Sequence, residues 1–168
     1  GVTELEGTTG GHLEQSSRVQ AVVDICGVIR VAEWPGSNRG LSTILGIPHA
    51  EDNGAYELAA LCSPDRHLSE DDPPFLILHG TADGAVDWNQ GLEFYNAARR
   101  LQKEVVLLSY PDEPHHLTKE ANQKDFQIRM MQYFDHYLRG VPAPEWLKEG
   151  VPFLEKGRKG VLKKKVVS

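Results

Sequence analysis

The chain has 168 residues, of which 40% are hydrophobic and 25% are charged, a composition typical of a globular domain. It excludes collagen, coiled coil and extended disorder. Because 24 Asp and Glu outnumber 18 Lys and Arg, the net charge of −6 opposes broad binding to nucleic acid or anionic membrane, and neither is expected as a partner.

No apolar run approaches the ~20 residues of a membrane span, and the start lacks the order of a signal peptide. We therefore expect a soluble protein of undetermined compartment, which would be secreted if an upstream segment carried a signal. The two cysteines, Cys26 and Cys62, have no metal-type spacing, so free thiols and a single disulfide both stay open.

Three short apolar runs predict buried strands. They are Val19 to Ile25 (VQAVVDI), Phe75 to Leu78 (FLIL) and Glu104 to Tyr110 (EVVLLSY). Between the first two, residues 27–53 predict a long, turn-rich loop that shapes a pocket, with at most one short helix, and residues 55–61 predict a short helix.

Two longer segments predict helices. Residues 88–101 place Leu92, Tyr95 and Ala98 on one stripe, which indicates an amphipathic helix that also packs Trp88. Residues 122–138 predict a second helix that Gly140 ends. Its expected buried face consists of Phe126, Met130, Met131, Phe134, Tyr137 and Leu138.

The order strand, helix, strand requires a parallel crossover, so the predicted fold class is α/β. Charge divides the chain into residues 1–140, which are acidic, and a tail of residues 141–168 with seven basic and three acidic residues. A solvated terminus is the interpretation that we favour for this tail over a nucleic-acid or membrane patch.

Candidate chemistry follows the carboxyl ends of two predicted strands, where open α/β sheets bind ligands. Asp83 lies on the loop after the second strand, in His79-Gly-Thr-Ala-Asp83, and His115 and His116 lie on the loop after the third. A carboxylate and an imidazole on neighbouring loops can meet, and the acid then holds the tautomer of the ring and stabilises its imidazolium.

These motifs resemble a known family. PPFLILHGTADGAVDWNQGLEFYNAARRLQKEVVLLSYPDEPHHL, followed by MMQYFDHYLRG, resembles the end of an α/β-hydrolase catalytic domain of the prolyl oligopeptidase type. GGHLEQSSRVQAVVD and SPDRHLSEDDPPFLILHG are similar to ferulic-acid-esterase-like and acetylesterase-like hydrolases. The resemblance covers about residues 10–140 and implies the carboxyl-terminal half of a hydrolase sheet, with its last three parallel strands and flanking helices.

By this resemblance Asp83 matches the triad acid and His115 the triad base. His116 falls where the family has a small or variable residue, which favours a structural or pocket-lining role. The order acid, then histidine, agrees with the Ser, Asp, His order of the fold.

The matching nucleophile is missing, because no G-x-S-x-G occurs in the chain. Gly7-Thr8-Thr9-Gly10-Gly11 has the glycine spacing, but it lacks a preceding buried strand and a following helix, so we interpret it as a chance likeness. Ser16, Ser17 and Ser37 fit no better. We expect the nucleophile, and with it the oxyanion hole, to lie upstream of Gly1.

The resemblance implies a serine hydrolase that acts on a small ester or peptide through an acyl-enzyme, without a cofactor. A metal site at His79, Asp83, His115 and His116 is the chemical alternative, but the spacing of metal ligands is absent and we expect no metal. The functional alternative is a non-catalytic, hydrolase-like binding module or a decayed fragment. In either case the first strand would present an unpaired edge that invites pairing with another chain.

Overall fold

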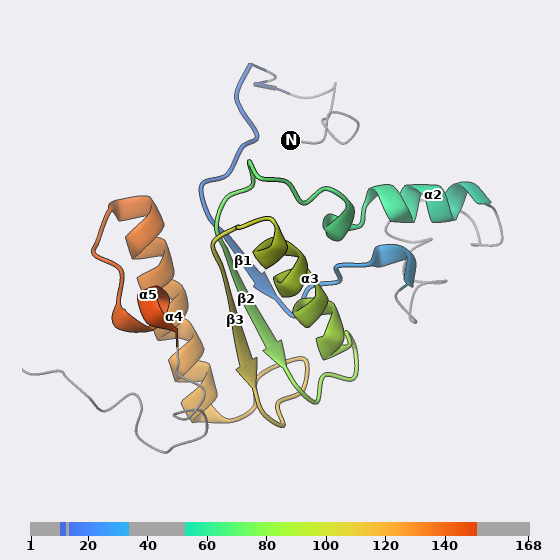
Figure 1. Cartoon of the computed structure of the whole chain (residues 1–168). Coiled ribbons are helices and arrows are strands. Elements are labelled where there is room, and N and C mark those ends of the chain that lie inside the picture. The colour runs from blue at the N-terminus through green and yellow to red at the C-terminus, as the bar shows by residue number, and fades with distance from the viewer. Residues whose placement is uncertain (1–10, 13, 34–52, 151–168) are drawn as a thin grey trace, which may run out of the picture.

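The structure is a computed structural model, and it describes residues 11–12, 14–33 and 53–150. Within these residues, three parallel strands form one sheet with helices on both faces (Figure 1). The predicted α/β class, with three parallel strands and flanking helices, is therefore confirmed. Thr9, most of the predicted pocket loop and the basic end of the tail lie outside the described residues.

The sheet has the order β1-β2-β3, with β2 in the centre. The strands are β1 (Val22–Ile25), β2 (Phe75–Gly80) and β3 (Val105–Tyr110). Both pairings are parallel and in register, with Phe75 opposite Val22 on one side and Val105 on the other. The carboxyl ends of β2 and β3 therefore lie side by side, where the candidate loops begin.

The first strand differs from its prediction. It begins at Val22 rather than Val19, whose side chain is 52% exposed, and Ile25 at its end is also 52% exposed. Within the described residues β1 pairs with β2 alone. Pairing of its other edge with a second chain stays a prediction.

The helices are α2 (Asn53–Leu61), α3 (Trp88–Arg100), α4 (Glu120–Arg139) and α5 (Glu145–Glu149). Single 3-10 turns occur at Val31–Glu33 and Pro64–Arg66. On one face of the sheet Ile77 packs with Phe94 of α3, and on the other Leu78 lies in a cluster that Phe126 of α4 joins. Among the described residues, the core thus has an apolar layer on each side of β2, and Figure 1 shows the two helices, α3 and α4, that cover the sheet.

The buried face of α3 is only partly the predicted one, because Ala98 is buried as expected but the rest of the face differs. Gly91, Phe94 and Ala98 are buried, whereas Leu92 and Tyr95 are only partly so. The prediction overlooked Phe94, whose ring contacts Phe75 edge-on at 5.1 Å between centroids. Because Gly91 contributes no side chain, an apolar count along the sequence could not assign it to the buried stripe.

The buried face of α4 is also partly wrong. Met131 and Leu138 are 59% and 53% exposed, whereas Tyr133 and Arg129 are buried. Tyr133 donates its hydroxyl to the carbonyl of Pro74, and Arg129 forms an ion pair with Asp125. The predicted stop is confirmed, because Gly140 adopts a left-handed φ of 68° that favours glycine.

α5 follows Gly140 and packs on α4. The indole of Trp146 donates to Gln132 at 2.7 Å and lies under the guanidinium of Arg129. None of the helices in the described ranges is long and apolar enough to cross a membrane.

We predict that Gly91→Ala destabilises the protein, although alanine is the better helix former by about 1 kcal/mol. A Cβ at Gly91 would lie 2.8 Å from Nδ1 of His79, whose side chain is fully buried. Urea unfolding should show a loss of about 1–3 kcal/mol, the usual range for overpacking. Asn96→Ala on the exposed side of α3 is the matched control, and equal behaviour of the two variants would refute the close packing.

Candidate functional site

The carboxylate of Asp83 lies on the loop after β2 and is fully buried. Its Oδ1 accepts the backbone N–H groups of Ala85 at 2.8 Å and Val86 at 3.0 Å, which anchor it from its own loop. Burial opposes ionisation, but these hydrogen bonds and that from His115 outweigh it and lower the pKa of Asp83. Asp83 is therefore held as an anion.

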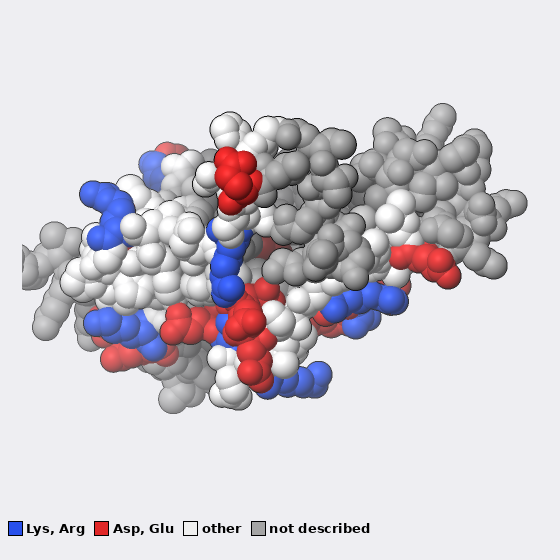
Figure 2. Space-filling view, turned by 90° about the horizontal axis from the view of Figure 1, so that it is seen from above, with Lys and Arg blue, Asp and Glu red and all other residues white. Residues whose placement is uncertain are grey.

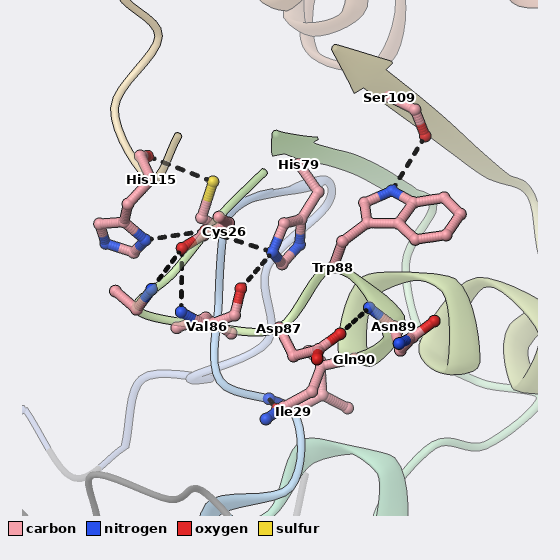
Figure 3. A network of polar contacts seen from close by, with 12 residues as sticks. Cys26, Ile29, His79, Val86, Asp87, Trp88, Asn89, Gln90, Ser109 and His115 are labelled. Carbon is pink, nitrogen blue, oxygen red and sulfur yellow. Dashed lines mark hydrogen bonds and ion pairs between the residues drawn. The ribbon is translucent and has the colours of Figure 1, made fainter. Parts of the chain in front are cut away.

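The ring of His115, which Figure 3 labels, lies on the loop after β3, and its Nδ1 faces this anion. Its Nδ1 is 2.9 Å from Oδ2 of Asp83, and its side chain is 37% exposed. Because an ionised carboxylate can only accept, Nδ1 carries the proton and Nε2 is left as the basic nitrogen. None of the described residues donates to Nε2, so this nitrogen can accept a proton from a reactant.

His116 occupies a different position. It is exposed, and its ring lies edge-on to that of His115 with centroids 4.9 Å apart. The structure thus brings Asp83 together with His115, as the sequence predicts, and leaves His116 without a contact to Asp83 among the described interactions. The assignment of catalytic roles to Asp83 and His115 stays a proposal.

Backbone hydrogen bonds join the two loops below this pair. Thr81 N–H donates to the carbonyl of Tyr110 at 3.0 Å, and Ala82 N–H donates to the carbonyl of Glu113 at 3.0 Å. The hydroxyl of Thr81 in turn accepts the N–H of Asp112 at 2.9 Å. These contacts fix the position of the loop after β3 relative to the loop after β2.

Gly80 is required for this close approach. A Cβ on Gly80 would lie 2.2 Å from the carbonyl oxygen of Glu113 and 2.6 Å from that of Pro114. Both atoms are backbone atoms, which cannot move aside as a flexible side chain can. The glycine of the His79-Gly80 motif therefore has a steric reason, namely room for the loop that carries His115.

His79 is a third member of the site, whose role the sequence did not indicate. The side chain is fully buried, and its Nε2 lies 3.0 Å from the carbonyl of Val86 and 3.3 Å from Oδ2 of Asp83. Since a carbonyl can only accept, Nε2 carries the proton of this ring. His79 therefore supports the same carboxylate oxygen that receives His115.

Glu113 is the second residue that sequence reasoning missed. Its buried carboxylate accepts the N–H and hydroxyl of Thr118 at 2.6 and 2.9 Å, the N–H of Lys119 at 3.2 Å and the side-chain amide of Asn122. Burial opposes its ionisation, but these donors lower its pKa to about 2. The anion also lies at the start of α4, where the helix dipole favours negative charge.

Three of the described side chains have donor atoms close enough to suggest a metal, namely Cys26, His79 and Asp83, whose atoms lie within 4.8 Å of one another. Each donor atom is already used. The thiol of Cys26 donates to the carbonyl of His115, and Nε2 of His79 donates to Val86. If Nε2 of His79 bound a cation, the proton of the ring would have to move to Nδ1, which has no acceptor among the described residues. We therefore interpret the cluster as a hydrogen-bond network.

The thiols also answer the question that the sequence left open. Cys26 and Cys62 are both free. Burial raises the pKa of Cys26 to about 11, which keeps it a neutral thiol at ordinary pH.

Comparison with known proteins agrees with the resemblance inferred from the sequence. The family model described as "Prolyl oligopeptidase family" matches residues 13–141. Dipeptidyl-peptidase 5 of Porphyromonas endodontalis is 29% identical over 94 residues, which are 56% of this chain and 14% of that protein. The chain thus spans a small part of the curated relative that it matches.

Two solved structures share the fold. A truncated form of a carbohydrate esterase from gut microbiota has a TM-score of 0.58 at 24% identity, covering 73% of this chain and 46% of that one. A puromycin-hydrolyzing peptidase of Mycobacterium tuberculosis has a TM-score of 0.57 at 24% identity, covering 71% and 18%. An esterase and a peptidase are therefore each similar in fold to more than two thirds of this chain, which confirms the predicted partial hydrolase sheet.

We predict that Glu113 stabilises the protein in a pH-dependent manner. Its folded pKa of about 2 lies below the ordinary value of 4.5, so its contribution is complete above about pH 4.5 and is lost as the pH falls through about 2. In urea unfolding, the gap in free energy of unfolding between wild type and Glu113→Gln should be constant from about pH 7 to 5 and shrink below about pH 4.5.

Glu120→Gln is the control, because Glu120 is also at the start of α4 but forms an exposed pair with Lys124. The difference in free energy of unfolding between Glu120→Gln and wild type should be small at every pH measured. A Glu113→Gln gap that stays the same down to about pH 3 would contradict the lowered pKa.

Proposed function

The chain belongs to the prolyl oligopeptidase family, and from that premise we propose that it supplies the acid and the base of a serine hydrolase. The observation that carries the proposal is the contact of 2.9 Å between Nδ1 of His115 and Oδ2 of Asp83, at the carboxyl ends of neighbouring parallel strands. In this fold, that edge of the sheet is where the reacting groups gather.

In the proposed reaction, a serine hydroxyl attacks the carbonyl carbon of an ester or peptide while Nε2 of His115 takes its proton. The tetrahedral intermediate collapses, the bond to the leaving alcohol or amine breaks, and His115 returns the proton to that group. Water then attacks the acyl-enzyme and gives a proton to Nε2 of His115. The bond between the acyl group and the serine oxygen breaks, and His115 returns the proton to that oxygen.

Asp83 contributes without accepting the proton itself. Its anion fixes the tautomer in which Nε2 is basic and stabilises the imidazolium that forms. The hydrogen bonds from Ala85 and Val86 keep the carboxylate in place while the charge on the ring changes.

The serine is proposed to lie on a segment upstream of Gly1, because none of the 168 residues lies in a G-x-S-x-G sequence. Peptidase and esterase activity both stay open under this proposal. Parallel assays of the gene product that includes the upstream segment, on a proline-containing peptide and on an acetyl or feruloyl ester, would separate them.

We predict that the 168-residue chain alone does not hydrolyse p-nitrophenyl acetate above background, because under this proposal the nucleophile lies upstream of Gly1. The measurement is the release of p-nitrophenol by the chain and by its His115→Ala variant. Turnover by the chain that disappears in His115→Ala would contradict the predicted inactivity of the chain alone.

In a protein that contains the upstream segment, Asp83→Asn should lower kcat by about 10⁴-fold, because the amide favours the wrong tautomer of His115. His115→Gln should have an effect at least as large. His116→Gln is the control and should change kcat by less than about tenfold, since its ring makes no described contact with Asp83. A larger loss in His116→Gln than in His115→Gln would exchange the roles of the two histidines.

A further inference from the structure

Glu113 connects three parts of the site, although no part of the proposed reaction uses it. It lies two residues before His115, on the same loop. Its carboxylate receives donors from Thr118, Lys119 and Asn122 at the start of α4, while its backbone carbonyl accepts the N–H of Ala82, next to Asp83.

The length of the connection explains why such an anchor is needed. Only Pro111, Asp112, Glu113 and Pro114 separate the end of β3 from His115, and Asp112 has a left-handed φ of 57°. This loop must approach Gly80 closely, because the carbonyls of Glu113 and Pro114 lie where a Cβ of Gly80 would be. A buried anion with several donors is a strong means of holding a loop in one such conformation.

From this arrangement we propose that Glu113 is a positioning residue, which sets the imidazole of His115 against Asp83 by fixing their two loops to the start of α4. The proposal rests on the proposed function, in which His115 and Asp83 form the acid–base pair. It adds a residue that does not touch substrate and that acts through His115.

A simpler role is that of a helix cap, in which Glu113 stabilises α4 and leaves the His115 ring unaffected. Both roles predict a loss of stability when the carboxylate is removed, so stability cannot separate them. The position of the Nδ1 proton of His115 can, because it depends on the contact with Asp83.

The experiment is NMR of the protein with ¹⁵N-labelled histidine rings, read for the tautomer of His115 and for the exchange of its Nδ1 proton with water. Wild type should show the Nδ1–H tautomer. Asp83→Asn should abolish the preference of the His115 ring for the Nδ1–H tautomer. Glu113→Gln should accelerate exchange of the Nδ1 proton of His115 with water by about tenfold, the effect of one lost hydrogen bond.

Two further variants make the result specific. Asn122→Leu keeps the negative charge of Glu113 and removes one donor, so a smaller acceleration in this variant assigns the effect to geometry rather than to charge. It also gives the result if Glu113→Gln does not fold. Glu120→Gln removes an exposed carboxylate from the same helix end and should leave the ring signals of His115 unchanged.

Two outcomes would overturn the proposal, and they can be told apart. If Asp83→Asn alters His115 but Glu113→Gln and Asn122→Leu only accelerate exchange of the amides of α4, Glu113 is a helix cap and the acid–base pair stands. If Asp83→Asn leaves His115 unchanged, the pair itself is wrong, and the positioning role falls with it.

Discussion

The site depends on keeping the carboxylate of Asp83 ionised although its side chain is fully buried. Taking a carboxylate out of water is unfavourable unless donors replace the lost hydration. Two backbone N–H groups supply them on one oxygen, and two imidazoles approach the other. Three of these four groups come from Asp83's own loop and from the end of β2, so the position of Asp83 is fixed mainly at β2, and His115 is the one partner that reaches it from the neighbouring loop.

Two glycines near β2 leave the space that neighbouring groups need in order to approach the strand closely. Gly80 admits the His115 loop, and Gly91 admits the ring of His79 beneath α3. Neither glycine is needed for a turn. Both are small because another group occupies the volume that their side chain would take.

Much of the fold and the pair Asp83 and His115 could be predicted from the sequence, for one physical reason. Parallel strands place their carboxyl ends at one edge, so residues that directly follow two neighbouring strands must lie near each other. Prediction was weaker for helix faces. Arg129 is buried in α4 because it pairs with Asp125, while Met131 and Leu138 are exposed, an arrangement that a count of apolar residues cannot foresee.

The supporting residues could not be predicted, because about half of their contacts are with backbone groups. His79 contacts the carbonyl of Val86, and Glu113 receives N–H groups of Thr118 and Lys119. Any residue type offers those groups, so the sequence carries no sign of them. The motif of His79, Gly80 and Asp83 indicates candidate site residues, but the path of the loop after β3 determines which side chains come into contact with them.

The proposed acid–base pair also explains why this chain is similar both to a peptidase and to an esterase. Attack on an ester and attack on a peptide both require a base that accepts the nucleophile's proton and returns it to the leaving group. A contact of 2.9 Å between His115 and Asp83 would suit either proposed reaction, because Nε2 of His115 can return a proton to the oxygen of a leaving alcohol or to the nitrogen of a leaving amine. Substrate choice must therefore come from side chains that contact the acyl and leaving groups, and these can change while the ends of β2 and β3 stay the same.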